Sequence, residues 1–209
     1  MHDRRLDSGQ QHRRHIPHAD TSLHPVPHGS QGGVGSGPIG PAALLAAQFY
    51  APSEIIMIDV KEDRLAVAKR FGATATVDSS HHANGDAAQQ VMALTGGRGV
   101  DTAIEAVGIP ATFTLCEDIV AAGGTIANVG VHGCKVDLHL ERLWSHNVTI
   151  TTRLVDTVSI PMLLKTVPSG RIDAGQLITH RFTLADIEQA YDTFSRAADT
   201  RALKMIIEA

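Results

Sequence analysis

The sequence has little cysteine, because Cys116 and Cys134 are the only two in 209 residues. Their spacing fits neither a disulfide framework nor a paired-cysteine zinc site, so we expect two reduced, unlinked thiols. Long apolar runs are also missing, and no stretch approaches the roughly 18 to 20 residues that span a bilayer. Residues 1–11 lack the apolar core of a signal peptide. The sequence therefore predicts a cytoplasmic protein with no membrane segment.

Positive charge is scarce as well. Lys and Arg number 18 against 22 Asp and Glu, which gives a formal net charge of −4. A protein that holds a phosphate backbone usually carries a basic surplus, so this balance argues against a nucleic-acid partner. The chain is long enough for one domain and part of a second.

Residues 1–33 differ in composition from the rest. They hold six of the twelve histidines, three prolines and four Val, Ile or Leu residues, with no helical or strand period. Such a stretch cannot bury enough apolar area to offset its ordering entropy, so we predict a disordered or foreign leader. His12, His15 and His18 could hold a metal from one helical face, but Pro17 disfavours a helix there.

From Val34 onward, strand-like and helix-like segments alternate, which is typical of a parallel sheet with crossover helices. This order predicts a doubly wound α/β domain of the Rossmann type over residues 34–157. Its strands are expected at residues 54–59, 75–77, 101–106, 125–129 and 148–152. Its helices are expected at residues 41–50, 62–71, 86–95, 110–121 and 140–145.

Residues 158–209 have another character. Thr183 and Asp186 form a capping pair for a helix on which Ile187, Tyr191 and Phe194 give one apolar face. These pieces do not make a core by themselves, so we expect them to be the end of a second domain. The other elements of this part are expected at residues 161–168, 178–182 and 203–208.

The chemistry is concentrated in a glycine-rich turn, Gly35-Ser-Gly-Pro-Ile-Gly40, which leads into the first predicted helix. Gly35 would allow the tight bend, Gly37 would let the backbone approach a pyrophosphate, and Gly40 would permit close packing of helix and strand. The amino end of the helix supplies oriented N–H groups for the phosphates. No G-K-[ST] follows and no G-x-S-x-G occurs, which disfavours a P-loop or a serine hydrolase.

Asp59 lies nineteen positions after Gly40, at the end of the next predicted strand. A carboxylate there accepts hydrogen bonds from both ribose hydroxyls of adenosine and repels a 2′-phosphate. A solvated strand-end acid is the alternative, and the further strand–helix units that follow weaken it. We therefore predict a dinucleotide site with a preference for NAD over NADP.

With these residues the sequence resembles the medium-chain, zinc-type alcohol dehydrogenases, from Val34 to Ala209. The resemblance implies a coenzyme domain followed by the end of a catalytic domain, whose zinc polarises an alcohol oxygen while hydride passes to nicotinamide. For the intact protein it implies a small alcohol or aldehyde substrate and a homo-oligomer. The motifs that carry it are Val34-Gly-Ser-Gly-Pro-Ile-Gly40, Ile58-Asp-Val60, Gly96-Gly-Arg-Gly-Val-Asp101, Ile104-Glu-Ala-Val-Gly108, Asn128-Val-Gly-Val131, Ile178-Thr-His180 and Leu203-Lys204.

The resemblance also implies which residues contact the coenzyme. Asp59 would bind the adenosine ribose with Arg64 beside it, Ile39 would back the nicotinamide ring, and Arg201 would contact the pyrophosphate. The wall near adenine and ribose would come from Val107 and Gly108. Backbone groups that hold the carboxamide would come from Val129, Gly130 and Val131. The rest of the set is the turn itself, with Gly35, Gly37, Pro38 and Gly40. Each charged residue could instead be solvated, and each valine could be sheet core.

Two departures from the family pattern matter, and the first concerns zinc. The family's zinc ligands and proton-relay residues precede the glycine turn, and nothing in residues 1–33 matches them. His132, His139, His146 and His180 show no carboxylate or thiolate partner at ligand spacing. We therefore assign no catalytic residue and no zinc ligand in this chain.

The second departure is the strand that should lead into Gly35. The segment from Pro25 to Val34 contains two prolines and several glycines, so we expect a degenerate first strand and an incomplete sheet. We hypothesise that the leader comes from a shifted reading frame or a misassigned start. The chain would then be the carboxyl-terminal portion of a dehydrogenase.

Three functions remain open. The favoured one is an NAD-dependent alcohol dehydrogenase, here without its zinc-ligand segment and inactive by itself. The second is a non-catalytic nucleotide-binding remnant. The third is a zinc-free quinone or enoyl reductase relative, which would prefer NADPH, and Asp59 argues against it.

Overall fold

The computed structural model describes residues 29–80, 84–154 and 157–209, so the histidine-rich segment with His12, His15 and His18 lies outside it. All neighbouring strands of its main sheet run parallel. These strands are β1 (Ser30–Val34), β2 (Glu54–Asp59), β3 (Ala75–Asp78), β4 (Val100–Glu105), β5 (Val120–Asn128) and β6 (Thr149–Thr152). Their order, β3-β2-β1-β4-β5-β6, is that of a dinucleotide-binding fold and confirms the predicted Rossmann-type architecture.

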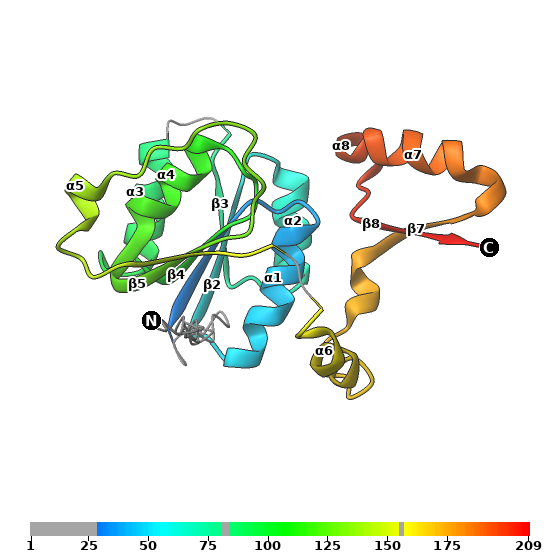
Figure 1. Cartoon of the computed structure of the whole chain (residues 1–209), viewed down its shortest axis with the longest axis horizontal. Coiled ribbons are helices and arrows are strands. Elements are labelled where there is room, and N and C mark those ends of the chain that lie inside the picture. Colours follow the sequence, from blue (N-terminus) through cyan, green and yellow to red (C-terminus); the bar gives the residue numbers. More distant parts are fainter. Residues whose placement is uncertain (1–28, 81–83, 155–156) are drawn as a thin grey trace, which may run out of the picture.

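Helices cover both faces of this sheet (Figure 1). On one face lie α1 (Ile39–Ala47), which continues as a 3-10 turn (Gln48–Tyr50), and α2 (Glu62–Arg70). On the other face lie α3 (Asn84–Leu94) and α4 (Pro110–Ile119). Successive side chains of a strand point to opposite faces, so Ile56 and Ile58 pack under α3 and α4 while Ile55 and Met57 pack under α1 and α2. Burial on both faces explains why β2 is a continuous apolar run.

The boundary between α4 and β5 differs from the prediction. Val120 and Ala121, expected in the last turn of the helix, are the first residues of β5. Val120 pairs with Val100 at the start of β4. A β-branched residue in register with a neighbouring strand favours the sheet over another helical turn.

The carboxyl-terminal elements lie on the α1 and α2 side of the large sheet (Figure 1). After α5 (Leu140–Leu143) and β6, they are α6 (Ile160–Thr166), β7 (Ile178–Thr183), α7 (Ile187–Ser195), α8 (Ala197–Thr200) and β8 (Lys204–Glu208). β7 and β8 form a parallel pair of their own. Leu203, just before β8, is buried in one cluster with Leu44 and Leu45 of α1, so the tail packs against the Rossmann domain there.

The residues of the predicted capping pair precede α7, but their side chains bond each other, and the Thr183 hydroxyl donates to the Asp186 carboxylate at 2.7 Å. Neither side chain caps the helix end, so the prediction of a capping box is wrong. The predicted apolar face of that helix is mostly open, because Tyr191 is 71% and Phe194 50% exposed. Within the described part of the chain, α7 buries Ala190 and Thr193 instead.

The first strand is present, which corrects the expectation of a degenerate strand, an incomplete sheet and a leader that extends to residue 33. β1 pairs with both β2 and β4 in the middle of the sheet. It begins at Ser30, after both prolines of the segment, so neither proline removes a hydrogen-bond donor from it.

Large neighbours take up the space that the two glycines of β1 leave. A Cβ added to Gly32 would lie 3.3 Å from side-chain carbons of Val100 and Ile119. One added to Gly33 would lie 2.7 Å from the sulfur of Met57. The apolar cover expected of the strand's own side chains therefore comes from the elements on either side.

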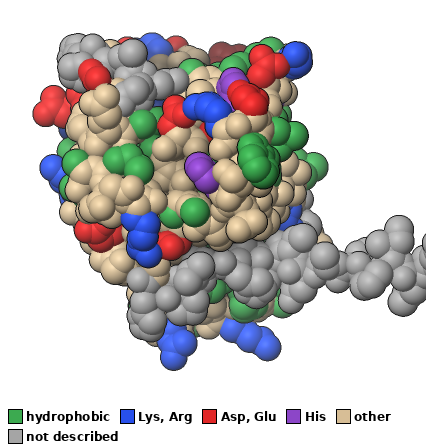
Figure 2. Space-filling model, turned by 90° about the vertical axis from the view of Figure 1, so that its left-hand side faces the viewer, with side chains coloured by type: hydrophobic (Ala, Val, Ile, Leu, Met, Phe, Trp, Pro, Cys, Tyr) green, Lys and Arg blue, Asp and Glu red, His purple; other side chains and the backbone are tan. Residues whose placement is uncertain are grey.

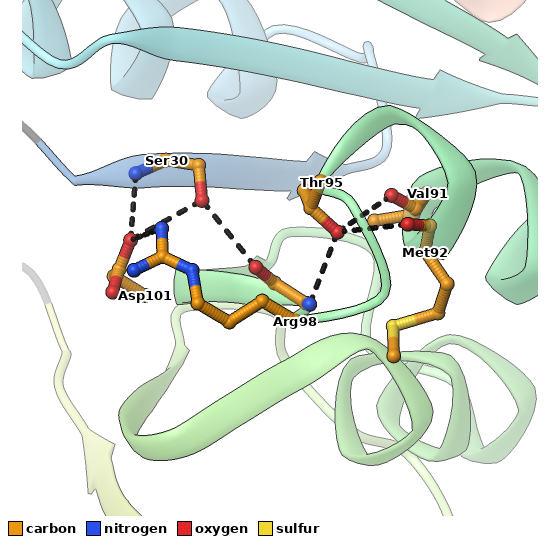
Figure 3. Close-up of polar contacts among 7 residues, drawn as sticks. Ser30, Val91, Met92, Thr95, Arg98 and Asp101 are labelled. Atoms are coloured by element: carbon orange, nitrogen blue, oxygen red, sulfur yellow. Dashed lines mark hydrogen bonds and ion pairs between the residues drawn. The ribbon is translucent and has the colours of Figure 1, made fainter.

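A carboxylate holds the start of β1 (Figure 3). The Asp101 Oδ2 atom accepts hydrogen bonds from the Ser30 N–H at 2.7 Å and from the Ser30 hydroxyl at 3.2 Å. Arg98 donates to the same oxygen at 3.3 Å. The turn that carries Arg98 is fixed in its place by Thr95, whose hydroxyl accepts the Gly99 N–H at 3.0 Å. A polar anchor thus positions a strand that has few apolar side chains.

Charges of both signs are interspersed on the face of the molecule shown in Figure 2, with neither sign gathered into one field. In the described residues, no helix combines the length and the apolar character needed to cross a membrane.

Candidate coenzyme site

The glycine-rich turn joins β1 to α1 at the carboxyl ends of the parallel strands. β1 has β2 on one side and β4 on the other, so the strand order reverses at this point. In open α/β sheets such a switch point forms the crevice in which ligands bind.

Two glycines of the turn are required by the fold itself. Gly35 has a left-handed backbone, with φ of 98°, and donates its N–H to the Ile58 carbonyl at 2.8 Å. A Cβ added to Gly40 would lie 1.9 Å from the Gly35 carbonyl oxygen. Any other residue at either position would force the turn to move.

Gly37 is different, because the fold does not require it. A Cβ there would lie 4.0 Å from Nη1 of Arg64 and, its chain neighbours aside, nearer to no other described atom. Its missing side chain therefore leaves the backbone open, with a guanidinium at the edge of the opening.

The amino end of α1 faces this opening with unused polar groups. Pro38 is the N-cap, no side chain caps the helix, and its first turn holds no acidic residue. The first-turn N–H groups are consequently available to an anion. The hydroxyl of Ser36 is buried beside them without a hydrogen-bond partner among the described residues.

Asp59 ends β2 next to the turn and is 7% exposed. Its Oδ2 accepts the Ser36 N–H at 2.6 Å, and its Oδ1 accepts the Lys61 N–H at 2.9 Å. A carboxylate oxygen can accept two hydrogen bonds, so each oxygen retains one acceptor position. Asp59 is thus both part of the turn and able to receive hydroxyl donors.

Val107 and Gly108 follow β4 and lie against neighbouring loops. The Val107 Cγ2 atom would lie 2.4 Å from a Cβ on Gly35, so Val107 borders the glycine turn. Gly108 has φ of 90°, and a Cβ there would lie 2.3 Å from the Val131 carbonyl oxygen. The turn after β4 therefore connects the glycine turn to the loop after β5.

The loop after β5 begins with Val129 and Gly130, whose N–H groups donate to the Glu105 carbonyl at 2.9 and 3.0 Å. Val131 follows with a side chain that is 80% exposed. Val107 and Ile39 are also exposed, so apolar side chains border the opening on several sides.

Arg201 is the expected residue that comes from the carboxyl-terminal part. It lies between α8 and β8 with an exposed side chain and a left-handed backbone, φ 58°. Leu203, two residues on, packs with α1. None of the hydrogen bonds and ion pairs of the described residues joins Arg201 to the glycine turn, so its contact with a pyrophosphate stays a prediction.

Two histidines have carboxylate neighbours that sequence spacing did not indicate. Nε2 of His132 lies 3.4 Å from Oε2 of Glu105, and Nδ1 of His139 lies 2.6 Å from Oε2 of Glu117. Both carboxylates are buried. The members of each pair are more than 20 residues apart in the chain, which is why sequence spacing could not show them.

Glu105 is a site residue that the sequence reasoning missed. Its carboxylate accepts the N–H groups of both Val107 and Gly108. The available signal was an acid at the end of a strand whose sequence is largely apolar after Thr102, because a buried acid needs partners.

The described residues do not form the zinc site that the resemblance implies. Within these three ranges of the chain, no three His, Cys, Asp or Glu side chains are grouped so that they could hold a metal ion. We therefore assign no metal-dependent chemistry to the residues that the structure describes.

Comparison with known proteins places this geometry in context. The family profile described as "Zinc-binding dehydrogenase" matches residues 38–167. An alcohol dehydrogenase of Cupriavidus necator is 35% identical over 167 residues, which cover 78% of this chain and 45% of that protein. An L-idonate 5-dehydrogenase of Vitis vinifera is 32% identical over 170 residues, or 79% of this chain and 46% of that protein.

Solved structures agree. Zinc dependent alcohol dehydrogenase 2 from Streptococcus pneumonia has a TM-score of 0.83 and 50% identity, over 87% of this chain and 52% of that one. Alcohol dehydrogenase TADH from Thermus sp. ATN1 has a TM-score of 0.80 and 28% identity, over 88% of this chain and 52% of that one. The chain spans about half the length of the relatives it matches. The profile match over residues 38–167 and the shared fold show that the chain belongs to the zinc-binding dehydrogenase family of oxidoreductases.

Proposed function

We propose that this chain binds NAD(H) across the carboxyl ends of β1 and β4, as the coenzyme half of an NAD-dependent alcohol dehydrogenase. The observation that carries the proposal is the open backbone at Gly37, between an uncapped helix end and the buried carboxylate of Asp59. The fold has no need of a glycine there, whereas a pyrophosphate does.

The pyrophosphate would lie over Gly37 and accept hydrogen bonds from the first turn of α1. The partial positive charge of the helix end favours an anion there. Arg64 borders the same opening and would add a full positive charge. We propose the same contact with the phosphates for Arg201, which belongs to the carboxyl-terminal part of the chain.

The adenosine ribose would lie against Asp59. The free acceptor positions of Asp59 match two vicinal hydroxyls, and its negative charge would repel the 2′-phosphate of NADP. Val107 and Gly108 would form the adenine side of the crevice. Ile39 would back the nicotinamide ring, and backbone groups of residues 129–131 would hold its carboxamide.

For the intact protein we propose hydride transfer between a small alcohol and NAD. Relatives bear the names alcohol dehydrogenase and L-idonate 5-dehydrogenase, both of which imply oxidation of a hydroxyl group. Residues 158–209 would be the end of the catalytic domain, and the zinc ligands would come from a segment that this chain does not match. A homo-oligomer in the cytoplasm is part of the same proposal.

A second candidate is a nucleotide-binding protein without catalysis. It is favoured by the absence of any grouping of three metal-ligand side chains in the part of the chain that the structure describes. Both candidates use the same coenzyme site and differ in turnover.

The experiment that tests the site is a fluorescence titration of the full chain with NADH, compared with its Gly37→Val variant. A Cβ has room at this position, so thermal unfolding should change little. NADH affinity should fall by about 30-fold or more, equivalent to about 2 kcal/mol of lost phosphate contacts. Gly133→Val is the matched control, because a Cβ at this exposed glycine meets no described atom within 4 Å and the position lies outside the glycine turn. Equal affinity in both variants would remove the glycine turn from the proposed role.

A further inference from the structure

A buried acid stands where the loops of the proposed coenzyme site meet. Glu105 is the last residue of β4 and is 0% exposed. Its Oε1 atom accepts three hydrogen bonds, from the Val107 N–H at 2.9 Å, the Gly108 N–H at 2.8 Å and the Thr112 hydroxyl at 2.7 Å. This oxygen fixes the turn after β4 against the start of α4.

The other carboxylate oxygen faces the loop after β5. A Cβ on Gly130 would lie 2.1 Å from Oε2, so only a glycine allows the loop to pass there. The His132 Nε2 atom lies 3.4 Å from Oε2 and 2.8 Å from the Asn128 Oδ1 atom. Oε2 itself accepts no hydrogen bond from the described residues.

The backbone of the same residue holds the second loop directly. The Glu105 carbonyl accepts the N–H groups of Val129 and Gly130. One residue therefore contacts the turn after β4 through one side-chain oxygen, and the loop after β5 through its carbonyl and its other side-chain oxygen.

A buried carboxylate is costly to desolvate, and hydrogen bonding to Oε1 alone does not require a charge. Oε2 packs against Gly130 and lies 3.4 Å from the His132 ring, so the size and charge of this atom affect the loop after β5 and not the turn that Oε1 holds. We infer that Glu105 is a positioning residue, which sets the loop after β5, where the nicotinamide carboxamide would be held, at its distance from the turn after β4 on the adenine side. This inference rests on the proposed NAD(H) site.

Replacement by glutamine distinguishes the two oxygens. Three donors converge on Oε1, so the amide oxygen of a Glu105→Gln variant must take that place. Its NH₂ group then faces Gly130 and His132, where the native chain has an acceptor. The turn with Val107 and Gly108 stays in position while the loop after β5 is displaced.

The test compares two ligands by calorimetry on the full chain. NADH spans the whole site, whereas ADP-ribose lacks the nicotinamide ring and its carboxamide. Glu105→Gln should weaken NADH about tenfold or more and change ADP-ribose binding by less than about threefold. His132→Gln, which removes the ring beside Oε2 together with its contacts to Asn128 and Phe113, should shift the same ratio in the same direction. It supplies the result if the first variant does not fold.

Glu117→Gln is the control, because Glu117 is another buried acid paired with a histidine, His139, and it lies near the carboxyl end of α4, whereas Thr112 lies in the first turn. It should leave the ratio of the two dissociation constants unchanged. Equal weakening of both ligands by Glu105→Gln, or no weakening of either, would overturn the positioning role. If the unaltered chain binds neither ligand, the proposed function itself fails and this inference falls with it.

Discussion

Asp59 has two tasks at the residue scale. It fixes the glycine turn through the Ser36 N–H and, in the proposed site, receives the ribose hydroxyls. Asp59→Asn keeps one acceptor oxygen but removes the charge that repels a 2′-phosphate. The preference for NADH over NADPH should therefore narrow by on the order of 1 to 3 kcal/mol, measured as the ratio of two dissociation constants.

Glu62→Gln is the matched control for Asp59, since it removes an exposed acid from the first turn of the adjacent α2. It should leave the coenzyme preference unchanged. An Asp59→Asn variant that retains the original ratio would remove Asp59 from its assigned role.

Cys116 gives the fold a dependence on alkaline pH. Burial, with smaller contributions from Glu105 and Glu117, raises the pKa of this thiol well above its ordinary value of 9.0. Above about pH 9 the unfolded chain releases this proton while the folded chain keeps it. The unfolded state then binds fewer protons, so the free energy of unfolding should fall with rising pH, by up to about 1.4 kcal/mol per pH unit from this group.

Urea unfolding at several pH values between 8 and 10.5 measures this slope. Cys116→Ala should reduce the slope of unfolding free energy against pH by the contribution of one proton. Cys134→Ala, at the exposed cysteine, should leave the slope unchanged. Identical slopes for the native chain and Cys116→Ala would contradict the assignment.

At the scale of elements, periodicity predicted most helices and strands after Val34 within a few residues. The exceptions are α8, which no expectation covered, and β5, which begins at Val120 and not at residue 125. β2 needed no tertiary information, because a continuous apolar run between polar ends has one stable place in a doubly wound sheet. β1 could not be predicted in this way. Its two glycines carry no pattern, and the side chains that cover it belong to Met57, Val100 and Ile119.

The two glycines of β1 should respond to alanine in opposite ways. A Cβ on Gly33 meets the flexible end of Met57 beside a small cavity, into which the thioether can move. Gly33→Ala should stabilise the fold by about 0.5 to 1 kcal/mol, through lower entropy of the unfolded chain. A Cβ on Gly32 is crowded by fully buried branched side chains, so Gly32→Ala should destabilise it by about 1 to 3 kcal/mol.

Denaturant unfolding of the two variants in parallel measures this difference, and the same sign of change in both would contradict the packing described for β1.

Some residues of the candidate site could be predicted from the sequence, and others could not. The glycine turn and Asp59 are local signals with a fixed spacing, so they could be found without a structure. Glu105 and His132 could not, because their proximity depends on β4 and β5 lying side by side.

At the scale of the whole molecule, large apolar side chains remain open. Trp144 is 77% exposed, Leu154 80%, Leu164 65% and Tyr191 71%. These residues are spread over several elements, at the end of α5, after β6, on α6 and on α7, and we expect the rest of the proposed enzyme to cover part of this apolar surface. The chain's coverage of about half of each relative is consistent with that view.

We therefore expect the chain by itself to show no dehydrogenase turnover. The substrate pocket and the zinc ligands of the proposed enzyme would come from the other half. Formation of NADH, followed by absorbance with primary, secondary and polyhydric alcohols in the presence of zinc, should not exceed that of a heat-inactivated sample. Turnover above that control would show that the described half contains catalytic groups not identified above.

The most direct measurement of the central claim is calorimetric titration of the full chain with NADH and, separately, with NADPH. The account predicts one saturable site for NADH and weaker binding of NADPH, because Asp59 repels the extra phosphate. No binding of NADH, or tighter binding of NADPH, would contradict it.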